Sequence, residues 1–271
     1  MDQLGTAIAH ELIIDIGGMP VLIRTGSPEF ARLLEERYGE FVTQDSDKPV
    51  FEFDVELAQP PTCNPDDDAS VRLESGRWIM ERGDFHAQWD PQRRRGWICQ
   101  TSNPYSIDSV LRILHSLILS REGGFLVHAA SAVRNGRAFL FAGVSGAGKT
   151  TISRLAPPDV TLLTDEISYV RPGETGYVAF GTPFAGELAR IGEKVRAPLA
   201  AVYLLVQGPE NRIEPVSEAE AARAMLQNIL FFAKDPELVH LIFQSVFDFV
   251  SRVPVRRLVF TRDARVWDLI Q

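Results

Sequence analysis

The chain has 271 residues, 45% of them hydrophobic, which is enough to bury a sizeable core in one large domain or two smaller ones. Its formal net charge of −8 at pH 7 argues against a surface whose main partner is nucleic acid or anionic lipid. The two cysteines, Cys63 and Cys99, form no disulfide or zinc pattern, and no signal peptide or run of about 18 apolar residues is present. These features predict a cytoplasmic protein with no membrane partner.

The first hundred residues alternate short apolar strands with turns and contain one clear helix. Strands over 11–16 and 21–24 flank a Gly-Gly-Met-Pro turn, which predicts a hairpin. Ser27 is the expected cap of a helix that begins at Pro28 and continues toward Phe41. Further strands are predicted over 50–57, 71–73, 78–81, 85–89 and 96–100.

Two clusters in this half have alternative interpretations. Trp78, Trp89 and Trp97 are expected on the apolar face of the sheet rather than on a stacking platform. The run at 93–95, Arg-Arg-Arg, is expected at a solvated hairpin tip, and a role in binding nucleic acid or a phosphopeptide is the less favoured alternative.

The second half alternates helices and strands. An amphipathic helix is predicted over 106–120, followed by strands over 125–133 and 138–142 that are joined by an Asn-Gly turn. This turn favours a hairpin, so we expect a mixed sheet. The predicted fold is α/β, with a strand-rich region at 1–104 and a phosphate-binding domain at 105–271. Its remaining elements are strands over 160–163, 167–171, 199–206 and 255–260, and helices over 217–231 and 236–250.

The stretch FAGVSGAGKTT at 141–151 fits the pattern G-x-x-x-x-G-K-[ST]. In this motif the backbone N–H groups wrap phosphate oxygens, the lysine neutralises them, and the hydroxyl meets Mg²⁺. An apolar run precedes the motif and a short helix follows it, as the motif requires. The residues expected to bind nucleotide are Gly143, Val144, Ser145, Gly146, Ala147, Gly148, Lys149, Thr150 and Thr151.

Phosphoryl transfer also requires carboxylates and cations around the phosphate. Asp165 follows a predicted strand shortly after the loop, and Glu166 is adjacent, so with Thr150 they are the candidate Mg²⁺ ligands. Asp165 or Glu166 could instead be an exposed acid at a strand end. His128 lies in the strand before the loop, where it is either a core histidine or a residue that orients a carboxylate or donates to phosphate. Arg190, Lys194 and Arg196 could close over the phosphates or form a solvated surface.

The segment VHAASAVRNGRAFLFAGVSGAGKTT, followed by LLTDE, resembles the catalytic domain of the HPr serine kinase/phosphorylase family. The resemblance implies a nucleotide-binding fold akin to phosphoenolpyruvate carboxykinase that uses ATP and Mg²⁺ to phosphorylate a serine on a protein. Family positions carry over to His128, Gly143, Gly148, Lys149, Thr150 and Asp165. On this pattern Lys149 is catalytic, Asp165 acts near the attacking hydroxyl, and His128 supports it.

The chain departs from the family pattern in three ways. Glu166 replaces the family's second aspartate, the first 124 residues do not resemble the family's N-terminal domain, and 185–196 contains no clear counterpart of its arginine loop. The leading hypothesis is a P-loop phosphotransferase, and the main alternative is a non-catalytic nucleotide-binding regulator or scaffold. A small-molecule kinase or carboxykinase is a third. The phosphoryl acceptor is a protein, peptide or small molecule, and the oligomeric state is left open, a homo-oligomer included.

Overall fold

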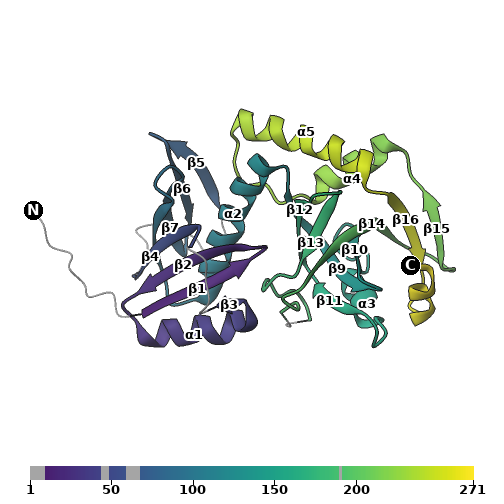
Figure 1. The fold of residues 1–271 in the computed structure, drawn as a ribbon, viewed down its shortest axis with the longest axis horizontal. Helices are drawn as coiled ribbons and strands as arrows, with labels where there is room; N and C mark the ends of the chain where they lie inside the picture. Colours follow the sequence, from purple (N-terminus) through teal and green to yellow (C-terminus); the bar gives the residue numbers. More distant parts are fainter. Residues whose placement is uncertain (1–9, 44–48, 59–67, 189–190) are drawn as a thin grey trace, which may run out of the picture. The chain divides into compact units, whose positions relative to one another are not determined.

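A computed structural model describes residues 10–43, 49–58, 68–188 and 191–271. Cys63 and Arg190 lie outside these ranges. The chain divides into two compact units, one made of Met1–Leu114 with Phe232–Asp235 and the other of His115–Phe231 with Pro236–Gln271 (Figure 1). The division falls within helix α2 (Pro104–Glu122). The predicted boundary between residues 104 and 105 stays a prediction.

The first unit is built on an eight-stranded sheet with the order β3-β1-β2-β4-β8-β7-β6-β5. The predicted first hairpin is confirmed, because β1 and β2 pair antiparallel. Helix α1 (Pro28–Tyr38) is followed by the 3₁₀ turn η1 (Gly39–Phe41), and the Ser27 hydroxyl caps α1 by accepting from the Phe30 N–H at 3.2 Å. The strands are β1 (His10–Ile16), β2 (Met19–Thr25), β3 (Val42–Thr43), β4 (Phe51–Leu57), β5 (Ser70–Glu74), β6 (Arg77–Arg82), β7 (Phe85–Asp90) and β8 (Arg95–Gln100).

The tryptophans of this sheet do not share one face, which corrects the expectation for Trp97. Trp78 pairs with Trp89 across β6 and β7, and both side chains are buried. Trp97 pairs with Gln88, so the two-residue period of the strands turns it to the opposite face, where it is 36% exposed. The arginine run lies as expected at the β7–β8 turn, and Arg95 forms an ion pair with Asp54 at 2.8 Å.

A buried ion pair joins α1 to α2 within this unit. The Arg37 guanidinium donates to the carboxylate of Asp108, and the Tyr38 hydroxyl donates to the same carboxylate at 2.6 Å. Ser106, in the first turn of α2, donates to Asp84 at 2.7 Å. Because buried charges are stable only when paired and hydrogen-bonded, these contacts fix α2 against the N-terminal elements.

The second unit contains a mixed sheet, as predicted from the Asn-Gly turn. Asn135 and Gly136 have φ values of 52° and 72°, the left-handed conformation that a tight hairpin requires, and they join β9 to β10. The strands are β9 (Phe125–Arg134), β10 (Arg137–Ala142), β11 (Thr161–Thr164), β12 (Ile167–Pro172), β13 (Tyr177–Phe180), β14 (Arg196–Gln207), β15 (Arg212–Pro215) and β16 (Val255–Phe260).

Five strands of this unit, β10, β9, β12, β13 and β14, pair in a closed circuit. β10 pairs with β9 along one edge and with β14 along the other, while β9 connects through β12 and β13 back to β14. β14 pairs in parallel with both β10 and β16. Their carboxyl ends therefore lie along one edge of the sheet, the place where open α/β sheets bind ligands.

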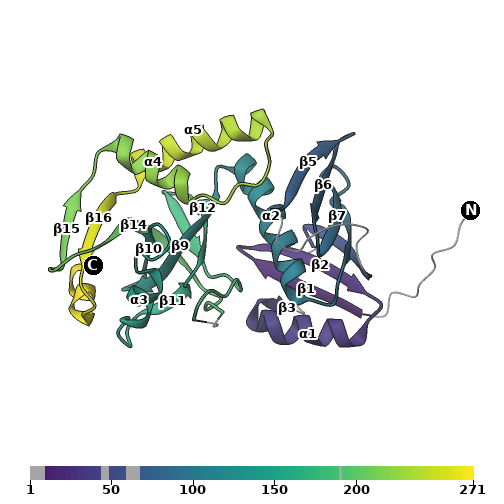
Figure 2. The same cartoon turned by 180° about the vertical axis from the view of Figure 1, so that it is seen from behind.

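Helices cover both faces of the second sheet (Figures 1 and 2). α4 (Glu218–Asn228) and α5 (Pro236–Arg252) pack on one hydrophobic core, which includes Val202 of β14. α3 (Lys149–Arg154) and the 3₁₀ segment η2 (Ala264–Leu269) pack on the other, which includes Tyr203 of the same strand. β14 is thus buried on both faces, as its apolar sequence predicts. In the described parts of the chain, no helix has the length and apolar character needed to cross a membrane.

Candidate functional site

The glycine-rich segment connects β10 to α3 as the sequence predicts. β10 ends at Ala142, the loop spans residues 143–148, and α3 begins at Lys149. The loop folds on itself, because the Ala147 N–H donates to the Val144 carbonyl at 3.0 Å. Val144 is 76% exposed, so the tip of the loop is open to solvent. The motif therefore lies at the carboxyl end of a strand and at the start of a helix.

Three glycines of the loop are required, two because of their backbone conformation and one because of a close neighbour. Gly146 and Gly148 have φ values of 78° and 114°, which side-chain-bearing residues adopt only with strain. At Gly143 there is no room for a side chain, since a Cβ there would lie 2.7 Å from the Ala147 Cβ. From β14, the Gln207 side-chain amide donates to the Gly146 carbonyl at 2.8 Å, a contact that the loop motif alone does not predict.

Lys149 is half-buried at the base of the loop. Its ammonium donates to the Gly143 carbonyl at 3.0 Å, which folds the side chain back along the loop. Burial lowers the pKa of Lys149, and the negative charges of Glu166 and Glu187 oppose that shift. The charges of two carboxylates thus act on Lys149, the residue that the motif predicts to bind phosphate.

Thr150 contacts a carboxylate that the sequence did not single out. Its hydroxyl donates to Oε2 of Glu187 at 2.9 Å. Glu187 ends the segment GTPFAGE at 181–187, a glycine-rich stretch that precedes three basic residues. The sequence shows an acidic residue at this position. Because it lies 37 residues after Thr150, nothing in the sequence indicates that the two side chains are in contact.

Asp165 and Glu166 lie in the bend between β11 and β12, both of which pair with β9. Because β11 has ended at this point, the two neighbouring side chains do not have to point to opposite faces of a sheet. Asp165 is buried, and its two carboxylate oxygens accept from the N–H groups of Gly186 at 2.9 Å and Leu188 at 2.8 Å. Glu166 is half-buried and acts electrostatically on Lys149.

Three other residues were predicted near the phosphate, namely His128, Lys194 and Arg196, and they do not lie together. His128 lies on β9 opposite Ile167, the residue that follows the Asp165–Glu166 bend. Lys194 precedes β14, and Arg196 is the first residue of that strand, where it pairs with Phe180. Strand pairing thus places His128 beside the acidic bend, whereas Arg196 belongs to a strand pair at the start of β14.

The C-terminal segment holds the helix that follows the loop. The indole N–H of Trp267 donates to the Ile152 carbonyl of α3 at 3.1 Å, and the Trp267 ring is fully buried against Phe141 at the end of β10. Because one side chain contacts both α3 and the preceding strand, it fixes the two ends of the loop relative to each other.

The oxygen donors beside the loop suit a hard cation. Within residues 10–43, 49–58, 68–188 and 191–271, no three His, Cys, Asp or Glu side chains form a group that could hold a metal ion by themselves. Mg²⁺ takes one or two protein oxygens and completes its shell with water and phosphate oxygens. The Thr150 hydroxyl and the Glu187 carboxylate, 2.9 Å apart, are donors of this kind.

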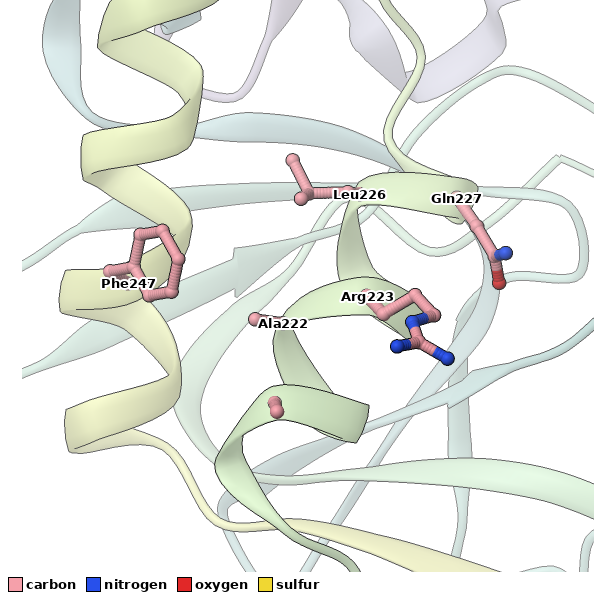
Figure 3. Close-up of a pocket in the computed structure, with 6 residues that line it drawn as sticks. Ala222, Arg223, Leu226, Gln227 and Phe247 are labelled. Atoms are coloured by element: carbon pink, nitrogen blue, oxygen red, sulfur yellow. The ribbon is translucent and has the colours of Figure 1, made fainter.

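A separate groove of about 440 Å³ lies between α4 and α5 (Figure 3). Phe247 of α5 faces Ala222 and Leu226 of α4 across it, and Arg223 and Gln227 complete much of its wall. Both helices pack on the sheet face opposite α3. The groove is therefore not part of the site at the loop.

Comparisons with known proteins give one family. A comparison with curated proteins found no match. Among solved structures, the chain is similar to the HPr(Ser) kinase/phosphatase from Coxiella burnetii, with 14% identity, a TM-score of 0.25, and coverage of 45% of this chain and 88% of that chain. The sequence model of the SynChlorMet cassette protein ScmC matches residues 100–271, which span α2, the loop and the rest of the second unit. The chain therefore belongs to the ScmC family of SynChlorMet cassette proteins.

Proposed function

We propose that this chain is an ATP- and Mg²⁺-dependent phosphotransferase that moves a phosphoryl group to a hydroxyl of a protein, a peptide or a small molecule. The observation that carries the proposal is the arrangement at the end of β10. There a glycine-rich loop is followed directly by Lys149 and Thr150, and Thr150 is hydrogen-bonded to the carboxylate of Glu187. A loop amide cradle, an ammonium, a hydroxyl and a carboxylate are the groups that phosphoryl transfer uses.

The loop has the features needed to hold phosphate. Residues 144–146 are exposed, so this part of the loop is open to a ligand. Lys149 donates to a loop carbonyl in this structure, and a bound phosphate oxygen would be a charged and therefore stronger acceptor. We propose the whole segment 143–151 as the nucleotide-binding loop.

The carboxylates beside the loop would help to bind the Mg²⁺ ion that accompanies the nucleotide. Thr150 and Glu187 would hold Mg²⁺ together with phosphate oxygens and water, with Asp165 and Glu166 close by in the acidic bend. When bound, the ion supplies neutralisation of charge on the β and γ phosphates. The charges of Glu166 and Glu187 would also favour the protonated Lys149 that phosphate binding requires.

In the proposed transfer, the acceptor oxygen attacks the γ phosphorus, the bond from that phosphorus to the β–γ bridging oxygen breaks, and ADP leaves. The hydroxyl proton goes to a carboxylate, for which the resemblance to HPr serine kinase implies Asp165. His128, on the strand beside the acidic bend, is the proposed support for that carboxylate.

A second candidate function is that of a nucleotide-binding regulator without turnover. One observation favours it: both oxygens of Asp165 already accept backbone N–H groups, which leaves this carboxylate engaged within the protein. Such a protein would bind ATP at the same loop and transmit its presence to a partner.

Turnover separates the two candidates. Purified protein would be incubated with γ-labelled ATP and Mg²⁺, and hydrolysis and transfer of label to protein and peptide libraries would be measured beside Lys149→Ala. A phosphotransferase hydrolyses or transfers phosphate, and Lys149→Ala loses that activity. ATP binding in the absence of hydrolysis and transfer would instead support the regulator.

A further inference from the structure

A small pocket lies on the outer face of the first sheet, over β4, β6, β7 and β8 and beside the β7–β8 turn. Its volume is about 240 Å³, and its lining combines arginine and aspartate side chains with one tryptophan. The lining residues that matter here are Arg77, Arg93, Arg95, Asp54, Asp90 and Trp97. All of them belong to the first unit, so the pocket is separate from the phosphate loop.

Two neighbouring rows of side chains line this pocket. Gln88 lies opposite Trp97, and two residues further along the same strands Asp90 lies opposite Arg95. Residues two apart in a strand point to the same face, so both rows lie on the outer face of the sheet. The rows are about 7 Å apart, because a strand rises about 3.4 Å per residue. The pocket thus joins an aromatic row to a charged row.

The charged row contains two guanidinium groups that share one carboxylate. Asp90 Oδ2 is 3.8 Å from Arg77 Nε and 3.9 Å from Arg93 Nε, and both separations are longer than a hydrogen bond. The other oxygen of Asp90 accepts the N–H groups of Gln92 and Arg93, each at 3.0 Å. Within the ranges that the structure describes, neither guanidinium makes a hydrogen bond, and the side chains of Arg77 and Arg93 are 51% and 75% exposed. Both guanidinium groups can therefore bind an anion from solution.

Trp97 supplies an apolar surface next to these cations. Its ring centroid is 5.8 Å from that of His86, and it is 36% exposed, whereas the other three tryptophans of the chain are buried. Tryptophan and arginine are the residue types enriched where protein interfaces gain most of their binding energy. The pocket therefore has the composition of a surface that contacts another protein.

The size and the charge of the pocket indicate the class of its ligand. Small-molecule sites have volumes of about 300–1,000 Å³ and enclose most of their ligand. This pocket is smaller and its arginines extend into solvent, so it suits one or two side chains of a larger partner. Residues 1–124 carry 21 acidic and 12 basic side chains, a net charge of −9, which disfavours a long polyanion such as a nucleic acid.

We propose that this pocket binds an extended acidic segment of a partner protein, with a carboxylate on Arg77 and Arg93 and an apolar side chain on Trp97. The two side chains of the segment would be two residues apart, since such residues point the same way and lie about 7 Å apart in an extended chain, as the two rows do. A guanidinium binds a carboxylate through two parallel N–H···O bonds. The proposal goes beyond the nucleotide site and does not depend on it, because the pocket lies wholly within the first unit.

The test measures binding of a fluorescein-labelled peptide, Ser-Glu-Ser-Phe-Ser-Glu-Ser, to the full chain by fluorescence anisotropy at low salt. One control peptide has glutamine in place of both glutamates, and a second has serine in place of phenylalanine. A labelled short oligothymidylate tests for a nucleic-acid site. Unlabelled phenylacetate, which carries a ring and a carboxylate, tests for a small-molecule site by competition.

Four protein variants are compared with wild type. Arg77→Gln combined with Arg93→Gln removes the two cations, Trp97→Ala removes the ring, and Trp97→Phe keeps an aromatic ring. Arg32→Gln is the matched control, because Arg32 is an exposed arginine of α1 whose ion pair, like that of Arg93, is with an acid three residues before it. Urea unfolding midpoints are measured for every variant, so that only folded proteins are compared.

We expect the acidic peptide to bind wild type and Arg32→Gln equally, with an affinity that falls as NaCl is added. The glutamine peptide should bind wild type about tenfold or more weakly, and the acidic peptide should show the same loss with the double arginine variant. Trp97→Ala should weaken binding of the acidic peptide to the level of the serine peptide, and Trp97→Phe should restore most of it. Lys149→Ala should bind the peptide as wild type does, so failure of the proposed nucleotide site would leave this result unchanged.

Several results would overturn the proposal. Equal affinity for the acidic and glutamine peptides would show that no carboxylate is recognised, and wild-type affinity in the double arginine variant would place the peptide elsewhere. Tighter binding of oligothymidylate than of the acidic peptide would assign the pocket to nucleic acid. Displacement of the peptide by an equal concentration of phenylacetate would assign it to a small molecule. Absence of peptide binding to wild type would reject it outright.

Discussion

The ring of Phe260, at the end of β16, closes the space beside Gly148 at the start of α3. A Cβ built on Gly148 would lie 2.6 Å from the Phe260 Cζ, closer than real Cβ atoms approach a neighbour. Gly148 also has a φ of 114°. The last glycine of the loop is thus constrained both by its backbone and by a ring from a parallel strand.

Gly148→Ala should therefore destabilise the protein more than Gly146→Ala. Gly146 has a positive φ as well, but a Cβ there meets nothing within 4 Å, so alanine adds only backbone strain of about 1–2 kcal/mol. At Gly148 displacement of the Phe260 ring is added to that strain. Urea unfolding midpoints measure the difference, and equal midpoints for the two variants would contradict this account of the loop.

Unfolding should depend on pH through His115, which is buried on α2. Burial lowers the pKa of His115 to about 3 from 6.5, and the charge of Arg171 acts in the same direction. Its Nδ1 lies 3.1 Å from the Tyr169 hydroxyl, and its Nε2 has no hydrogen-bond partner among the described residues. The folded protein therefore keeps this ring neutral at pH values where the unfolded chain takes up a proton.

The sign of this effect follows from proton uptake by the unfolded chain. As pH falls from about 6.5 toward 3, His115 should lower the free energy of unfolding by up to about 1.4 kcal/mol per pH unit. His115→Leu should remove that part of the slope. Unfolding curves at pH 7, 6, 5 and 4 measure it, and identical slopes in the two proteins would show that His115 does not titrate in this way.

Trp267→Phe should weaken the support behind the loop. The change removes the indole N–H that the Ile152 carbonyl accepts and leaves that buried carbonyl without this donor, at a cost of about 1–3 kcal/mol. Trp97→Phe is the matched control, since Trp97 lies on the outer face of the first sheet. The free energy of unfolding from urea titrations should fall clearly in the first variant and change by about 0.5 kcal/mol or less in the second. Equal losses would contradict the supporting role of Trp267.

Many elements of the fold were predicted correctly from short stretches of the sequence. The apolar run of β10, the Asn-Gly turn before it and the cap at Ser27 predicted elements that the structure confirms, because each is set by residues that are neighbours in sequence. β16 was predicted with the bounds that it has, Val255–Phe260. Trp97 was assigned to the wrong face because the position of a side chain depends on strand register, which an isolated tryptophan does not indicate.

The site was predictable only where its residues are contiguous. The segment from Gly143 to Thr151 is one stretch of sequence, and the structure places it as expected, with a loop over 143–148 after β10 and then the first residues of α3. Glu187 contacts Thr150 and Gln207 contacts Gly146 from distant parts of the chain, and nothing in their local sequence indicates these contacts. Asp165 was found by its place after a strand, but its contacts with the N–H groups of Gly186 and Leu188 depend on a chain reversal that spacing does not reveal.

The central claim is that the loop binds the phosphates of a nucleotide through Lys149. It is tested most directly by titrating ATP and Mg²⁺ into the wild-type protein and into Lys149→Ala in a calorimeter. Loss of a charge-assisted contact to phosphate should weaken binding by about tenfold or more. Binding to wild type with at least tenfold weaker binding to Lys149→Ala is the predicted result. Equal affinity in the two proteins, or no binding to either, would contradict it.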